Sequence, residues 1–339
     1  RMRLKINFLV LVCSLGLVAP VRAQANNDDD LDRKLKTPNY YGGTGVFHLF
    51  DPDTLRIKDY ISGIQVVQYH RDPLDLRIRN AIATTAYGVR DRLELYVSFY
   101  GASEVARRDL NAPLVTGNIE LAPIDHINHL SQLPLPPWPF DYYPAFPYLA
   151  QKVGHDNADG YAGLKFNLAS ERRGNPLGLA VIGEMKINTE RSPIILFRGT
   201  RSGATEGGFR VAASKQLGRV KWMTTTGLIF NGGALYPGGR NFALPNEWQT
   251  ALGAEFRLSE RIHLVGEFYN QQFWGHRIAS IHEINPRDIA IGVQYFPWTT
   301  FGLIAGYRKF LNPLYPHSDH NGFTVGFHFR KAFRWMARH

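Results

Sequence analysis

Apolar and polar residues alternate along residues 247–257, where apolar residues such as Phe256 fall on one face and polar residues such as Glu255 on the other. Successive side chains of a β-strand point to opposite faces, so this period of two predicts a strand. After residues 258–260 the alternation resumes over residues 261–271. Because so few residues separate the two arms, we expect them to pair as an antiparallel hairpin. Each arm has about ten residues, which is the length that a tilted strand needs to cross a bilayer.

The same alternation recurs along most of the chain and predicts about twelve strands of this length. They are residues 57–69, 77–88, 92–100, 159–169, 177–188, 207–216, 219–230, 247–257, 261–271, 287–295, 299–310 and 321–330. Short connections alternate with longer ones, and the longer ones are residues 70–76, 101–158, 189–206, 231–246, 272–286 and 311–320. Outer-membrane barrels show this pattern, with short periplasmic turns and long external loops. The sequence therefore predicts an all-β fold, a transmembrane antiparallel up-and-down β-barrel over residues 57–330.

Composition agrees with a barrel and excludes a helical membrane protein. The hydrophobic fraction is 44% and the mean hydropathy is −0.24, values that suit strands with one apolar and one polar face. The net charge is +10, but the basic residues are scattered, so no nucleic-acid partner is expected. The only cysteine, Cys13, lies in the expected leader, so no disulfide is expected in the exported protein.

The ends of the chain carry signals of export. Residues 1–23 predict a secretory signal peptide, because a basic start precedes an apolar run and the small residue Ala23 stands at the expected cleavage point. Residues 24–56 are expected to form a periplasmic N-terminal segment ahead of the barrel, and residues 331–339 a short C-terminal tail. The expected location is the outer membrane of a Gram-negative type bacterium, with outer-membrane lipid as the surrounding partner.

A glycine-rich stretch precedes the first expected strand. Gly42, Gly43 and Gly45 are followed by an apolar run and then by Asp51-Pro52-Asp53. This stretch resembles the opening of some bacterial outer-membrane barrels, including barrels linked to exopolysaccharide export and the barrel parts of OmpA-like proteins. The resemblance covers about fifteen residues and implies a barrel of that general kind. No OmpA-like periplasmic domain follows the barrel, so peptidoglycan binding is not implied.

Charged residues of both signs fall on the faces expected to point inward, because charges are costly on the lipid side of a membrane strand. These candidate lumen-lining residues are Glu94, Lys165, Glu184, Lys186, Arg210, Lys221, Glu255, Glu267 and Arg308, with Glu247 beside them. One interpretation is a network of ion pairs that fills the barrel. The other is a path for solutes, since twelve strands lie between the filled eight-stranded and the open sixteen-stranded barrels. The near balance of sign argues against strong charge selectivity.

The long connection 101–158 contains a proline-rich and aromatic stretch, residues 133–148. Proline prevents regular strand pairing here, and a connection of this length is rarely featureless. Three interpretations stay open: a constriction or plug inside the lumen, an outer cap, or an aromatic platform for a sugar or a partner. A loop that only packs on its neighbours is the simplest alternative.

No catalytic site, metal site or cofactor is expected. The spacings Asp125-His126 with His129, and His317 with Asp319-His320, lack a fixed third ligand. No Gly-x-Ser-x-Gly motif is present. The predicted function is porin-like passage of small solutes, or a structural or export-accessory role at the cell surface that could involve surface polysaccharide. The alternatives are an outer-membrane barrel enzyme of lipase or protease type, and a soluble secreted β-sandwich binding protein.

Overall fold

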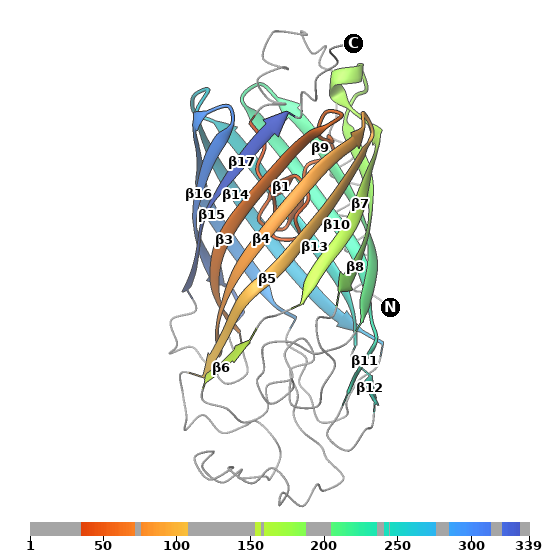
Figure 1. The fold of residues 1–339 in the computed structure, drawn as a ribbon, viewed down its shortest axis with the longest axis vertical. Helices are drawn as coiled ribbons and strands as arrows, with labels where there is room; N and C mark the ends of the chain where they lie inside the picture. The colour runs from red at the N-terminus through yellow and green to blue at the C-terminus, as the bar shows by residue number, and fades with distance from the viewer. Residues whose placement is uncertain are drawn as a thin grey trace, which may run out of the picture.

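The chain forms a closed β-barrel (Figure 1). The computed structural model describes residues 35–71, 76–107, 153–156, 159–187, 205–235, 241–243, 245–275, 285–312 and 321–332. Twelve of the thirteen strands in its large sheet form the wall, and each pairs antiparallel with its neighbours. They are β3 (Asp59–Arg71), β4 (Leu76–Arg90), β5 (Leu93–Arg107), β7 (Gly160–Ala169), β8 (Gly178–Ile187), β9 (Glu206–Leu217), β10 (Val220–Asn231), β13 (Asn246–Arg257), β14 (Ile262–Trp274), β15 (Arg287–Trp298), β16 (Phe301–Phe310) and β17 (Asn321–Ala332). Pairing of β17 with β3 closes the barrel.

The remaining elements are short. β6 (Val153–Asp156) extends the edge of β5, and β11 (Gly233–Leu235) pairs with β12 (Asn241–Ala243) beyond the wall. β1 (Gly45–Val46) and β2 (Leu49–Phe50) form a separate two-stranded sheet. A single turn of 3-10 helix, Glu171–Arg173, lies between β7 and β8. Over the described ranges, no helix is long and apolar enough to span a membrane.

The predicted fold class is confirmed, and the closed barrel excludes the β-sandwich alternative. Short turns follow β4, β9, β13 and β15, as the alternation of connection lengths predicts. One predicted long connection is wrong: β3 continues to Arg71 and β4 begins at Leu76, so only four residues separate them where residues 70–76 were expected. Cross-strand hydrogen bonding continues beyond the residues with the clearest alternation. The alternation therefore underestimates the length of the strand.

Side-chain direction follows the alternation. In the β13–β14 hairpin, Phe256 pairs with Leu264 and both are exposed on the outer face. Val265 and Glu267 point the other way and are buried. An apolar outer face and a polar inner face are what a barrel in lipid requires. The wall therefore separates a hydrocarbon-compatible surface from a polar lumen.

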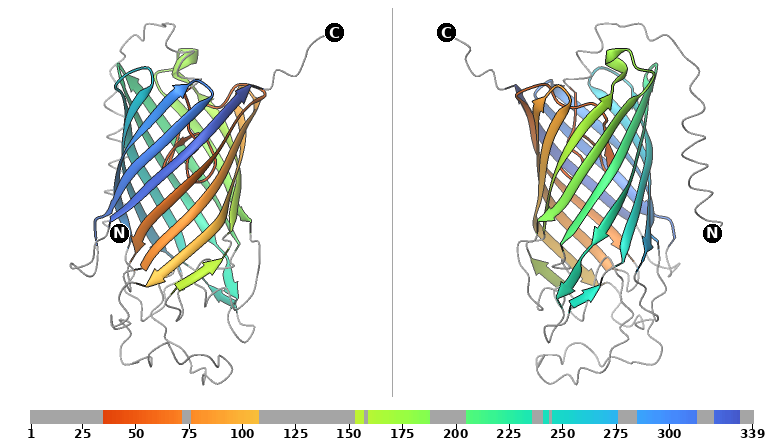
Figure 2. Two further views of the ribbon diagram at one scale, coloured as in Figure 1. Left: turned by 60° about the vertical axis from the view of Figure 1, so that its left-hand side comes forward. Right: turned by 90° about the vertical axis from the view of Figure 1, so that its right-hand side faces the viewer.

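The segment ahead of the first wall strand lies inside the barrel, in the half nearer the short turns (Figures 1 and 2). We call residues 35–56 the plug. Nearly all of its residues are buried, and Leu49 and Phe50 are fully so. The sequence placed residues 24–56 ahead of the barrel and did not predict that residues 35–56 fold back into it. Its apolar residues need burial, and a twelve-stranded lumen has room that wall side chains alone do not fill.

Candidate functional site

Glycine allows the plug to turn within the narrow lumen. Gly42 has a φ of +102°, a left-handed conformation that residues with a Cβ rarely adopt. A Cβ at Gly42 would also collide with the backbone of Val97 on β5. The plug then reverses at Phe47 and His48, between the paired residues Val46 and Leu49. The Gly-rich stretch of the sequence is thus a device for close approach to the wall.

The wall is shaped to receive the apolar side chains of the plug. Gly292 of β15 and Gly306 of β16 face each other across the strand pair. A Cβ on either glycine would lie 2.8 Å from Cζ of Phe47. Gly253 of β13 likewise leaves space for Leu49, because a Cβ on Gly253 would lie 2.6 Å from Cδ1 of Leu49. Close packing of this kind fixes one position of the plug rather than a loose filling of the lumen.

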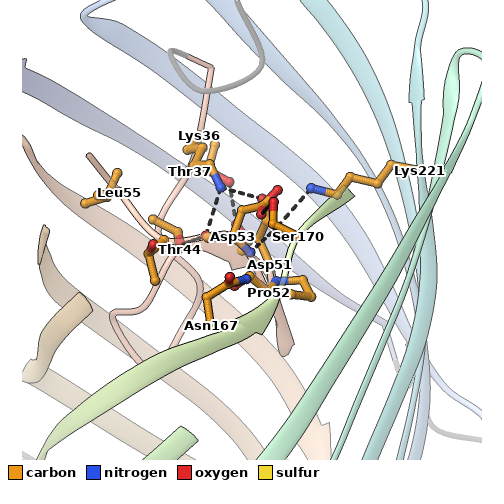
Figure 3. A network of polar contacts seen from close by, with 12 residues as sticks. Lys36, Thr37, Thr44, Asp51, Pro52, Asp53, Leu55, Asn167, Ser170 and Lys221 are labelled. Atoms are coloured by element: carbon orange, nitrogen blue, oxygen red, sulfur yellow. Dashed lines mark hydrogen bonds and ion pairs between the residues drawn. The ribbon is translucent and has the colours of Figure 1, made fainter. Parts of the chain in front are cut away.

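A group of buried charges holds the plug near the short-turn end (Figure 3). The Asp51 carboxylate accepts a hydrogen bond from Lys36 Nζ at 2.7 Å and, as an ion pair, contacts Lys221 Nζ of β10 at 2.9 Å. Lys165 Nζ of β7 donates to the carbonyl oxygen of Asp51 at 2.9 Å. Three ammonium groups therefore converge on one residue of the plug. Two of them, Lys36 and Lys165, are buried.

The Glu94 carboxylate of β5 joins the wall to the plug a second time. Glu94 and Lys165 are register partners on β5 and β7, both fully buried, with an ion-pair distance of 2.9 Å. The same carboxylate accepts hydrogen bonds from the backbone N–H groups of Thr44 at 2.9 Å and Leu55 at 3.0 Å. A buried ion pair is costly unless its remaining hydrogen-bonding capacity is satisfied. Here the plug satisfies it.

Asp53 ties the plug to the connection between β7 and β8. Its carboxylate accepts hydrogen bonds from Ser170 Oγ at 2.6 Å and Arg172 Nη2 at 2.8 Å. The neighbouring Pro52 carbonyl accepts one from Asn167 Nδ2 at 2.8 Å (Figure 3). The Asp51-Pro52-Asp53 motif is therefore a fastening point, with both carboxylates directed at basic residues.

The plug charges are ionised at neutral pH. Burial raises the pKa of the Asp51 carboxyl, but Lys221 and then Lys36 outweigh that effect and hold its pKa well below its ordinary value. Burial lowers the pKa of the Lys36 ammonium to about 8, against the opposing attraction of Asp51. Asp51 is therefore a carboxylate and Lys36 largely an ammonium at pH 7.

The tip of the plug is held by a second polar group. His48 Nδ1 lies 2.7 Å from Glu267 Oε1 of β14, and the His48 backbone N–H donates to the same carboxylate at 2.9 Å. Arg308 Nη2 of β16 lies 3.3 Å from His48 Nε2. The imidazole ring stacks on Tyr269 at 3.9 Å between centroids. A neutral imidazole satisfies both contacts, with Nδ1–H donating to Glu267 and Nε2 accepting from Arg308.

Between plug and wall, a small cavity of about 30 Å³ remains near the short-turn end. Lys36 and Asp51 line it from the plug, and Lys221 and Glu255 line it from the wall. A water molecule needs only about 10–15 Å³ of such space. The cavity accommodates water but is too small for an organic solute.

Aromatic and charged side chains also contact the plug on the side that faces the long connections. Arg210 of β9 forms an ion pair with Glu184 of β8 at 2.5 Å. Its guanidinium lies 4.3 Å from the ring centroid of Tyr41. Tyr161 makes an edge-on contact with Tyr41, with 5.9 Å between ring centroids. This part of the lumen therefore contains tyrosine rings and paired charges.

The structure places all of the candidate lumen-lining residues on the inner face of the wall. Seven are buried, namely Glu94, Lys165, Glu184, Lys186, Arg210, Glu267 and Arg308, while Lys221 and Glu255 are half-buried. The wall residues at the plug base are Glu94, Lys165 and Lys221, and those at its tip are Glu267 and Arg308. Glu255 instead pairs with His263 at 2.7 Å.

Sequence reasoning missed the plug residues that complete these groups, chiefly Lys36, His48 and Asp51. The glycines and the Asp-Pro-Asp motif were the available signal, and they indicated only the opening of a barrel. Several other expectations lie outside the described residues: the signal peptide at 1–23, residues 133–148, the His/Asp spacings at 125–129 and 317–320, and the end of the tail. Within the part of the chain that the structure describes, no three His, Cys, Asp or Glu residues cluster as metal ligands would.

Comparison with known proteins identifies solved structures with a similar barrel. No family model matches the chain, and no curated protein sequence matches it. Among solved structures, the chain is similar to an outer membrane channel from Pseudomonas putida F1, with a TM-score of 0.59, 9% identity, and coverage of 83% of this chain and 98% of that chain.

Two further structures are more distant. The NanC porin gives a TM-score of 0.45 at 8% identity, covering 78% of this chain and 98% of that one. The KdgM porin in complex with disordered oligogalacturonate gives 0.41 at 5% identity, covering 80% and 98%. All three are described as a channel or a porin. At 9% identity the first similarity establishes the fold alone: the chain shares the β-barrel fold of that outer membrane channel. The narrower resemblance to OmpA-like or exopolysaccharide-export barrels stays a prediction.

Proposed function

We propose that the chain is an outer-membrane channel for small polar solutes and that the plug keeps its lumen closed at rest. The observation that carries this proposal is the relation between plug and wall. β1 and β2 pair only with each other, and the plug adds no strand to the wall. Its contacts with the wall described above are made through side chains. The plug can therefore leave the lumen without breaking the hydrogen-bond ladder that closes the barrel.

The proposed orientation follows from the connection lengths. Short turns face the periplasm in outer-membrane barrels and long loops face outward. The base of the plug, around Asp51, then lies at the periplasmic end, and its tip, around His48, faces incoming solute. In this orientation a solute first meets the paired charges of Arg210 and Glu184 and the tyrosine rings beside them, including Tyr41 of the plug.

The side chains that line the lumen on the side of the long connections suggest which class of solute the channel would accept. Basic residues such as Arg210 and Arg308 are matched by carboxylates at Glu184 and Asp288, at 2.5 and 2.8 Å. Tyrosine rings stand beside them, including Tyr41. Neutral or zwitterionic molecules with hydroxyl or amide groups suit such a surface better than highly charged ions, because these charges of the wall are already paired.

Planar-bilayer recording of the purified, folded protein tests the proposal. We expect rare, discrete openings from a closed baseline, and liposomes containing the protein should become permeable to small neutral solutes. Folding is checked by the shift in gel mobility on heating. A folded barrel that stays electrically silent at every voltage, and liposomes that stay impermeable, would contradict the channel and favour a structural role at the cell surface.

A further inference from the structure

Basic side chains gather on the outer face of the barrel near its long-connection end. In β16 the buried Arg308 points into the lumen, so Lys309, the next residue, points outward and is exposed. In β15 the exposed Arg287 precedes the buried Asp288. Arg77 and Arg79 of β4 alternate with inward-facing residues and keep 37% and 43% of their side chains exposed. We call Arg77, Arg79, Arg287 and Lys309 the basic rim.

The strand order places the basic rim on one side of the barrel. β4, β3, β17, β16 and β15 are consecutive in the wall. Arg79 pairs with Gln68 of β3, which pairs with Phe323 of β17. Lys309 pairs with Asn321 at the start of β17. At about 4.8 Å between neighbouring strands, Lys309 and Arg79 stand three strands, or roughly 14 Å, apart across the sheet, and they are offset by two residues along it.

Within the described chain, the basic rim carries more basic than acidic groups. Arg77 forms an ion pair with Glu104 of β5 at 2.9 Å, and Arg79 donates from Nε and Nη2 to Gln68 Oε1 at 3.3 and 2.9 Å. These contacts orient the two guanidinium groups. Arg287 and Lys309 form no ion pair with any residue that the structure describes. Among the described residues, one carboxylate, that of Glu104, thus stands against four basic groups and pairs with two of them, Arg77 and Arg79.

On the opposite side of the barrel, the outer face at the long-connection end is apolar rather than basic. There the outward side chains are large and apolar: Met185, Ile187, Phe209, Phe230 and Trp274 are all exposed. Among the outward side chains that the structure describes at this end, the basic ones therefore lie on one side of the barrel and these large apolar ones on the other. Directly beside the basic rim, toward the middle of the wall, the outer face becomes apolar, with Ile291, Tyr307, Phe323 and Val325 exposed.

We propose that the basic rim binds the phosphate groups of lipopolysaccharide in the outer leaflet of the membrane. Guanidinium groups match phosphate oxygens with paired N–H donors, and basic clusters beside an apolar band recognise anionic lipid headgroups. The apolar side chains beside the rim contact the acyl chains of the same lipid. The spread of the rim over five strands suits a headgroup that carries more than one phosphate. This inference depends on the membrane orientation of the barrel and not on solute passage.

Binding of fluorescent lipopolysaccharide to the folded protein in detergent tests the inference. Arg287→Gln with Lys309→Gln should weaken binding about thirtyfold, since each basic residue near an anionic lipid surface contributes about fivefold. Adding Arg77→Gln and Arg79→Gln should abolish specific binding. The matched control is Arg219→Gln with Lys331→Gln, which removes two exposed basic residues at the short-turn end and should leave the affinity unchanged. A dephosphorylated form of the lipid should bind the unaltered protein weakly.

Several results would overturn the inference. They are unchanged affinity in the Arg287→Gln, Lys309→Gln protein, an equal loss in the control protein, or equal binding of the dephosphorylated lipid. Displacement of the lipid by inorganic phosphate at low millimolar concentration would assign the rim to free anions instead. The two-residue protein decides the matter if the four-residue protein does not fold, because Arg287 and Lys309 form no ion pair within the described chain.

Discussion

Replacing Asp51 with asparagine is expected to open the channel. The Asp51 carboxylate lies 2.7 Å from Lys36 Nζ and 2.9 Å from Lys221 Nζ, and the residue is 8% exposed. Asparagine has the shape of aspartate but no charge, so Asp51→Asn leaves both ammonium groups without their counter-charge. Removing one partner of a buried ion pair costs about 3–5 kcal/mol. Because Lys221 is only half-buried and can be rehydrated, we take the lower figure of about 3 kcal/mol.

That energy acts on the balance between the closed and open positions of the plug. A difference of about 1.4 kcal/mol changes an equilibrium tenfold, so about 3 kcal/mol raises the ratio of open to closed channels roughly 150-fold. Single-channel recording in planar bilayers measures this ratio as the open probability. The matched control is Glu104→Gln, which removes a carboxylate that is also paired with basic residues but lies on the outer face. The control should keep the open probability of the unaltered protein.

The reasoning would be refuted if folded Asp51→Asn protein had the same open probability as the unaltered protein. An equal increase in the Glu104→Gln protein would also refute it, because the effect would then report general loosening of the barrel. Heat-dependent gel mobility separates both outcomes from misfolding.

Three further predictions concern the same contacts. Gly306→Ala should raise the open probability, because its Cβ would lie 2.8 Å from Cζ of Phe47; with Phe47→Ala already present the added effect should vanish, a non-additivity that bilayer recordings on the four proteins would detect. Acidification below about pH 4 should also raise the open probability, because the pKa of Asp51 is lowered when the plug is in place. The Asp51 carboxylate therefore favours the closed state above its ordinary pKa, and this preference for the closed state is lost as the pH falls through the lowered pKa. A constant open probability down to about pH 3 would contradict this prediction. Lys165→Met should destabilise the barrel by about 3–5 kcal/mol, because it leaves the Glu94 carboxylate buried and unpaired. The double variant Lys165→Met, Glu94→Gln should recover much of the lost stability, and urea unfolding of both variants measures the difference.

The wall of the barrel could be predicted because its signal is local. A period of two is visible within about ten residues, and it assigns each side chain to one face whatever the partner strand is. Glu267 and Arg308 could therefore be placed on the inner face from sequence. Strand ends were less accurate, as at Arg71, because pairing beyond the alternating stretch depends on the neighbouring strand.

The plug could not be predicted because its contacts are distant in sequence and its backbone is irregular. Tyr40 donates or accepts a hydrogen bond at 2.6 Å with Thr324, a residue 284 positions away. No periodicity marks such a segment, and its glycines signal only a turn. The pairing of Glu94 with Lys165 was equally out of reach. Both could be placed inside the barrel, but only the strand register makes them neighbours.

The most direct test of the central claim is the conductance of a protein that lacks residues 36–55. The claim is that the plug closes a barrel wall that is complete without it. The shortened protein is expected to fold with the same heat-dependent gel mobility and to conduct continuously in planar bilayers, at a level above the openings of the full chain. A shortened protein that folds but conducts no more than the full chain would contradict the claim, and so would one that cannot form the barrel at all.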